Sequence, residues 1–220
     1  FLFLLILGGH VGTSILAAII SGVLCIESAR AFYKLEDRAE KAKALLGCSW
    51  LVVFVNILFP KSMLESVIVA FLGLFMYFLV TAEKHSHELK AHFDEFVFTV
   101  FSLIYCVVLI TFLPLVRSGI NGLQWALMFF VINWAGDTGA YFVGRSWGKQ
   151  KLYPLISPGK SVEGAVGGLL ASIAGAWLFK LVAFSSLSWL AAFATAVCVG
   201  AVAQVGDLCE SFFKRAYGIK

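Results

Sequence analysis

Charged residues are scarce in this chain: they make up 14% of its 220 residues, whereas apolar residues make up 60% and the mean hydropathy is +0.91. Soluble domains carry about 25% charged residues, so an ordinary soluble domain is excluded. The high apolar content also excludes intrinsic disorder. Aromatic residues do not alternate with cations along a basic stripe, so no nucleic-acid partner is expected. These exclusions leave a protein that crosses a membrane several times.

Cysteine patterns for metal binding or disulfide bonding are also missing. The chain has five cysteines, an odd number, and no two of them form a Cys-x-x-Cys pair. All five lie in or at the edges of apolar runs, where a thiol acts as a small apolar side chain. We therefore expect no disulfide and no metal at these positions.

Apolar runs separated by charged residues or by Gly, Asn and Pro predict an all-α, polytopic bundle of about seven or eight transmembrane helices. A hydrocarbon core about 30 Å thick needs about 20 apolar residues per helix. The predicted spans are Phe1–Ile26 (broken at Gly8-Gly9-His10), Leu45–Phe59, Ser66–Ala82, Phe96–Val116, Leu123–Val143, Ala165–Phe184 and Leu187–Val205. Leu45–Phe59 is short for a span, so this helix is expected to begin near Ala42.

The spans are grouped into two regions. Residues 1–122 are expected to form N-terminal transmembrane helices, and residues 123–220 a catalytic transmembrane region with a basic loop. Because Phe1 lies inside an apolar run and Lys220 follows a charged segment, we expect both ends to be cut from a longer protein.

The distribution of Lys and Arg predicts the orientation in the membrane. Of the 17 such residues, 14 fall in segments 27–44, 83–95, 144–164 and 206–220, which lie on one side of the predicted bundle. Two lie in loops on the other side, and Lys180 lies inside a span. Loops rich in Lys and Arg stay in the cytoplasm, so the four basic segments are predicted to be cytoplasmic.

Two aspartates lie at the predicted cytoplasmic ends of spans, where an acid is costly and therefore a functional candidate. Asn133, Asp137 and Tyr141 follow one another at intervals of four residues and share one face of a helix. Asp207 lies on a second stripe, with Gln204, Ser211 and Lys214. A carboxylate, a hydroxyl and a cation on one stripe suit a site for Mg²⁺ and phosphate. The alternatives are a buried hydrogen-bond network at Asp137 and a solvated helix end at Asp207.

The most polar loop, residues 144–164, lies between these two stripes. Its segment Gly159-Lys160-Ser161 is similar to the end of a P-loop, but position 154, where a P-loop needs Gly, is Pro. We reject a P-loop and expect a Lys and a hydroxyl near a flexible turn to hold phosphate. A loop that only sets the topology is the alternative.

Three segments together resemble the phosphatidate cytidylyltransferases, which make CDP-diacylglycerol. They are Asp137–Arg145 (DTGAYFVGR), Lys151–Gly164 (KLYPLISPGKSVEG) and Gly206–Lys220 (GDLCESFFKRAYGIK). Glu27 resembles an acid of that family near the end of an early span. The family signature opens as Ser211–Arg215 does and continues past Lys220 to an Asp that shares the metal, so this chain is expected to be inactive alone.

The resemblance implies transfer of CMP from CTP to phosphatidic acid, with release of pyrophosphate and with Mg²⁺ and a second, monovalent cation as cofactors. It places the enzyme in a lipid bilayer, in the inner membrane of a bacterial cell, with a cytoplasmic catalytic face; a homodimer is a compatible assembly. The expected catalytic residues are Asp137, Lys160, Asp207 and Lys214, with both aspartates as metal ligands. The expected substrate-binding residues are Arg145, Ser157, Lys160, Ser161, Glu163, Ser211, Lys214 and Arg215.

Two other functions remain open from the residues. A polyprenol or dolichol kinase is a lipid enzyme that would use a nucleoside triphosphate as phosphoryl donor. An ion-coupled transporter would use the same acids inside the membrane for ion coupling.

Overall fold

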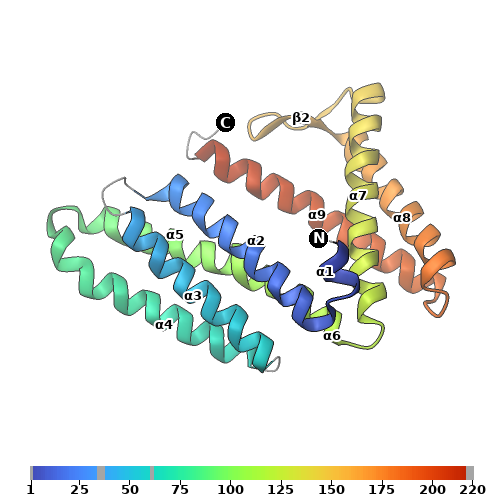
Figure 1. Ribbon diagram of the computed structural model, residues 1–220. Helices are drawn as coiled ribbons and strands as arrows, with labels where there is room; N and C mark the ends of the chain where they lie inside the picture. The colour runs from blue at the N-terminus through green and yellow to red at the C-terminus, as the bar shows by residue number, and fades with distance from the viewer. Residues whose placement is uncertain (1, 34–37, 60–61, 217–220) are drawn as a thin grey trace. The chain divides into compact units, whose positions relative to one another are not determined.

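The computed structural model describes residues 2–33, 38–59 and 62–216 and consists almost entirely of helices (Figure 1). The all-α prediction is confirmed, with one short β-hairpin as an addition. The elements are α1 (Leu2–Ile6), α2 (Gly9–Phe32), α3 (Arg38–Leu58), α4 (Met63–Thr81), the 3₁₀ helix η1 (Ala82–Glu88), α5 (Leu89–Ser102), the π-helix η2 (Leu103–Val108), α6 (Leu109–Ser118), α7 (Gly122–Trp147), β1 (Lys151–Tyr153), β2 (Ser157–Ser161), α8 (Val162–Ala183) and α9 (Trp189–Ala216).

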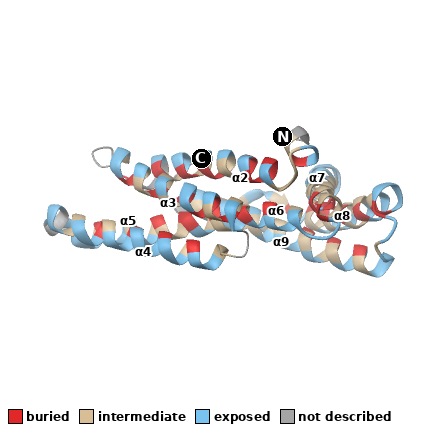
Figure 2. Ribbon diagram, turned by 60° about the horizontal axis from the view of Figure 1, so that its bottom comes forward, coloured by how far each residue is buried: buried red, intermediate tan, exposed pale blue. Residues whose placement is uncertain are grey.

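Seven helical stretches of the described residues are long and apolar enough to cross a bilayer. They correspond to α2, α3, α4, the continuous run α5–η2–α6, α7, α8 and α9. The chain is therefore a multi-pass membrane protein, and the predicted number of spans is confirmed. In Figure 2, buried residues alternate along the helices with intermediate and exposed ones. Many of the exposed residues are large and apolar, as contact with lipid requires.

Several helices extend beyond the apolar runs that predicted them. Helix α3 begins at Arg38, earlier than Ala42, and α9 continues past Val205 to Ala216. The backbone of a helix satisfies its own hydrogen bonds, so a span can continue as helix where its side chains become polar. Lys41, expected in a loop, is a buried residue of α3, 2% exposed, and its ammonium pairs with the carboxylate of Glu95 on α5.

The chain forms two compact units, of which the first is Phe1–Leu123. Within it, α2 packs against α3 and α6, and α4 packs against α3 and α5. Their shared core includes Cys25, Leu45, Val52, Leu74 and Val107. The predicted break in the first apolar run is confirmed, because Gly9 has φ of +57° at the junction of α1 and α2. This left-handed conformation favours glycine.

The second unit, Gln124–Lys220, contains α7 from its first turn onward, the β-hairpin, α8 and α9. Small residues let its helices approach closely. A Cβ added to Gly139 of α7 would lie 2.4 Å from the Cβ of Ala171 on α8, and one added to Gly136 would lie 2.6 Å from the hydroxyl of Ser172. Four small residues at four-residue intervals on α8, Gly164, Gly168, Ser172 and Ala176, are all buried.

Candidate active site

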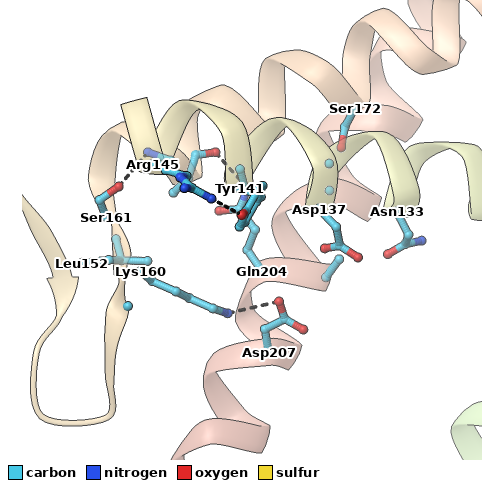
Figure 3. A pocket seen from close by; sticks show the side chains of 18 of the residues that line it. Asn133, Asp137, Tyr141, Arg145, Leu152, Lys160, Ser161, Ser172, Gln204 and Asp207 are labelled. Carbon is cyan, nitrogen blue, oxygen red and sulfur yellow. Dashed lines mark hydrogen bonds and ion pairs between the residues drawn. The ribbon is translucent and has the colours of Figure 1, made fainter. Parts of the chain in front are cut away.

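A cavity of about 480 Å³ lies between α7, α8, α9 and β2 in the second unit. Figure 3 shows its polar side chains facing one another across the space between the helices. The polar lining consists of Asn133, Asp137, Tyr141, Arg145, Lys160, Ser161, Ser172, Gln204 and Asp207. Ile132, Gly136, Ala140, Gly200 and Ala203 are among the small and apolar residues of the remaining wall. The cavity therefore combines a charged part with an apolar part.

One face of α7 supplies four of these polar residues, each one turn after the last. The predicted common face of Asn133, Asp137 and Tyr141 is confirmed, and Arg145 extends it. The amide nitrogen of Asn133 donates to the carbonyl of Phe129 over 2.7 Å, which leaves the side-chain carbonyl oxygen as the group available to a ligand. Arg145 donates to the Tyr141 hydroxyl over 2.7 Å, so this cation is oriented within the cavity wall.

The β-hairpin positions Lys160. Strands β1 and β2 pair antiparallel, with Lys151 opposite Ser161 and Tyr153 opposite Ser157. The Lys160 ammonium donates to the Asp207 carboxylate of α9 over 3.1 Å (Figure 3). Lys160 and Ser161, the Lys and hydroxyl expected near a turn, lie in β2, close in sequence to the hairpin turn. The turn lies at residues 154–156, and β2 continues directly into α8.

Ser161 joins the hairpin to α8. Its hydroxyl caps the helix by accepting the Gly164 N–H over 3.1 Å. A side chain at position 164 would be tightly placed, since its Cβ would lie 3.1 Å from the Cα of Gly144 on α7. The glycines at this crossing therefore allow the first turn of α8 to lie against the end of α7, where Ser161 lines the cavity.

Glu163 is held by the backbone. Its carboxylate accepts the N–H of Lys149 over 3.1 Å and that of Gln150 over 3.2 Å. Among the residues that the structure describes, the cavity lining does not include Glu163. Its contact with substrate stays a prediction.

The other predicted residues of α9 and the hairpin lie beyond the cavity lining, as far as the described residues show. Lys214 pairs with Glu210 over 2.6 Å, one turn earlier on α9. Arg215 donates to the carbonyl of Ile156 in the hairpin turn over 3.4 Å. Ser211 lies on α9 and Ser157 begins β2. Residues 217–220, the end of the third resembling segment, lie outside the described residues.

The sequence analysis assigned no site role to two neutral residues of the cavity wall, Ser172 and Gln204. Ser172 lines the cavity and donates to the Ile132 carbonyl over 2.9 Å. Gln204, noted as a member of the Asp207 stripe, lines the cavity and donates to the Ala165 carbonyl over 2.9 Å. The available signals were the four-residue spacing of Ser172 from Gly168 and the three-residue spacing of Gln204 from Asp207.

The carboxylates of the cavity suit magnesium better than a metal that needs a full set of protein ligands. Asp137 lies within electrostatic reach of both Asp207 and Lys160. Within the described residues, no three or more His, Cys, Asp and Glu side chains form a cluster that could hold a metal. Mg²⁺ commonly takes one or two carboxylates and completes its shell with water and substrate phosphates. Asp137 and Asp207 are the carboxylates of the cavity that could supply such ligands.

Comparison with known proteins places the chain beside enzymes of one kind. The sequence model of the cytidylyltransferase family matches residues 1–220. Over 129 residues, or 58% of this chain and 48% of the relative, it is 41% identical to the phosphatidate cytidylyltransferase of Staphylococcus saprophyticus. It is 37% identical to that of Bacillus subtilis over 129 residues, with the same two shares. The chain spans about half the length of the curated relatives it matches.

Proposed function

The chain belongs to the cytidylyltransferase family, and from this we propose that its protein transfers the cytidylyl group of CTP to phosphatidic acid. The products are CDP-diacylglycerol, for phospholipid synthesis, and pyrophosphate. The observation that carries the proposal is the cavity in which Lys160 and Asp207 meet near Asp137, inside a membrane-spanning unit.

The reaction requires little proton transfer from the protein. An oxygen of the phosphatidic acid phosphate attacks the α-phosphorus of CTP. The bond from that phosphorus to the oxygen bridging the β-phosphate breaks, and pyrophosphate leaves with the bonding electrons. The attacking phosphate is already anionic near neutral pH, so the main difficulty is to bring two polyanions together in line.

The cations and the carboxylates of the cavity would have different roles in this reaction. Lys160 and Arg145 would donate to the triphosphate oxygens, and charge-assisted bonds of this kind are stronger than neutral ones. Asp137 and Asp207 would hold Mg²⁺, which neutralises phosphate charge and orients the reacting groups. Ser211, Lys214 and Arg215 would extend the phosphate-binding surface along α9. We also propose a second, monovalent cation and a homodimeric assembly, to be tested by cation-dependent assays and by mass determination in detergent.

The composition of the cavity wall supports a substrate with an anionic head and an apolar tail. Its charged residues include Arg145, Lys160 and Asp207, while Ile132 and Ala203 belong to the apolar part. A lipid would bring its phosphate to the cations sideways from the bilayer, and CTP would approach from water. With the basic segments in the cytoplasm, this face would be the cytoplasmic side of the inner membrane of a bacterium.

Label transfer from CTP tests the function directly. The full-length protein is incubated in mixed micelles with phosphatidic acid, Mg²⁺ and CTP labelled at either the α- or the γ-phosphate, and the lipids are separated by thin-layer chromatography. We expect the α label in the lipid and the γ label in pyrophosphate. A γ label in the lipid would instead show phosphoryl transfer, as in a polyprenol kinase. Flux into liposomes without nucleotide, and no labelled lipid, would show a transporter.

A further inference from the structure

The carboxylate of Glu163 closes the open end of the hairpin. It bridges two successive backbone amides, those of Lys149 and Gln150, which precede β1. Next to this contact, the Val162 N–H donates to the Gln150 carbonyl over 2.9 Å. The first turn of α8 is thereby fastened to the segment that leaves α7, at the base of the hairpin.

This fastening lies close to Lys160 along the chain. Glu163 follows Lys160 by three residues, with the helix cap Ser161 between them. The strand pairing itself is irregular, because the register shifts between Lys151 and Tyr153. A pair of short strands with an irregular register is only marginally stable on its own. The position of Lys160 therefore depends on how firmly the base of the hairpin is held.

We propose that Glu163 is a positioning residue that fixes the base of the β-hairpin through the Lys149 and Gln150 amides and so holds Lys160 against Asp207 in the cavity. The inference rests on the proposed function, because it assigns Lys160 to the nucleotide. It gives Glu163 no contact with substrate or metal.

The charge of Glu163 matters for this role. Two successive N–H groups point at one carboxylate, and hydrogen bonds to a charged acceptor are the stronger kind. A glutamine at this position keeps the length but offers one acceptor oxygen, and its amide nitrogen would face an N–H donor. Glu163→Gln should loosen the hairpin base while α8 keeps its Ser161 cap.

A double-mutant cycle distinguishes positioning from general damage. In the full-length protein, we expect Glu163→Gln to raise the apparent KM for CTP about tenfold with little change in the KM for phosphatidic acid. In a Lys160→Met background the same change should have almost no further effect on the KM for CTP, because residues acting through one another are not additive. Asp94→Asn, which removes an exposed carboxylate from α5, is the matched control and should leave both KM values unchanged.

Hydrogen exchange provides a readout that does not depend on catalysis. In the wild type, the amides of Lys149 and Gln150 should be protected, and Glu163→Gln should remove that protection while the amides of the α8 interior keep theirs. Full protection in Glu163→Gln would overturn the proposal, and so would additive effects in the cycle. A higher Mg²⁺ requirement in Glu163→Gln, with the amides still protected, would make Glu163 a metal ligand instead. An enzyme that fails to use CTP at all would refute the proposed function but would leave the exchange result intact.

Discussion

The ammonium of Lys160 on β2 lies 3.1 Å from the carboxylate of Asp207 on α9, and 47 positions of sequence separate the two residues. Their side chains are 32% and 56% exposed, so the pair contributes at most about 1 kcal/mol to stability. An ion pair this weak is readily replaced by contacts of each residue with other charged groups. Under the proposed function, Lys160 would turn to a phosphate oxygen and Asp207 to a metal ion.

Asp207→Asn is expected to abolish turnover while the bundle stays folded. The amide removes the negative charge that Mg²⁺ needs. Mutation of a residue that only supports a metal ligand already lowers metal affinity or activity about 10- to 100-fold. Loss of a ligand itself should therefore lower the rate at least about a hundredfold. Rates at limiting Mg²⁺, together with circular dichroism, check this expectation, and Glu65→Gln is the control. A near wild-type rate at limiting Mg²⁺ would exclude Asp207 as a ligand. Asp137→Asn should also be severe.

Lys160→Ala should weaken the use of CTP much more than the use of phosphatidic acid. A hydrogen bond to a charged group is worth roughly 1.5–3 kcal/mol, so the apparent KM for CTP should rise about ten- to a hundredfold. Lys151→Ala, a change to an exposed cation of the same hairpin, should have little effect. Kinetics with each substrate varied separately decide the matter. An increase confined to the KM for phosphatidic acid would assign Lys160 to the lipid. We also expect Lys214→Ala to weaken the use of CTP.

Gly139→Ala should destabilise the second unit. The added methyl group would lie 2.4 Å from the Cβ of Ala171 and 2.9 Å from the carbonyl oxygen of Gly167, so α7 and α8 would have to move apart. Overpacking of this kind costs about 1–3 kcal/mol. Thermal unfolding in detergent should show a lower midpoint. Gly47→Ala adds the same methyl group where nothing lies within 4 Å, and it should not lower the midpoint. Equal midpoints for both variants would contradict close helix packing at Gly139.

The hairpin is expected on the cytoplasmic side of the membrane. Lys151→Cys, in a background without other cysteines, places one exposed thiol on β1. A membrane-impermeant maleimide should label it in inside-out vesicles and not in right-side-out vesicles. Labelling from the outer side alone would reverse the orientation.

Hydropathy predicts most of the fold because lipid imposes a simple rule: each span must be about 20 largely apolar residues of helix. The same rule misplaced the start of α3, since Lys41 looks like a loop residue until Glu95 is known to face it. Four-residue spacing likewise placed Asn133, Asp137 and Tyr141 on one face, because helix geometry is local.

The sequence pattern did not predict the hairpin, because its structure depends on contacts that are not local in the sequence. Its strands have only three and five residues. Pro154 and Gly159 are typical of loops, so the sequence pattern favours a loop at this position. The contacts that stabilise the hairpin join residues that are distant in the sequence. The Glu163 carboxylate accepts hydrogen bonds from the Lys149 and Gln150 amides, and the Lys160 ammonium donates to Asp207 on α9. Side-chain pattern along a chain does not reveal contacts with backbone amides or between distant helices.

The buried pair of Lys41 and Glu95 also sets an order of events during synthesis. The two residues are 54 positions apart, and the ribosome adds about 5–20 residues per second, so Lys41 is made roughly 3–11 s before its partner. During that interval α3 lacks the contact that joins Lys41 to Glu95 of α5. We expect α3 to stay beside the insertion machinery until α5 arrives. Chains stalled before residue 95 should therefore crosslink from α3 to that machinery, and chains stalled well after it should not.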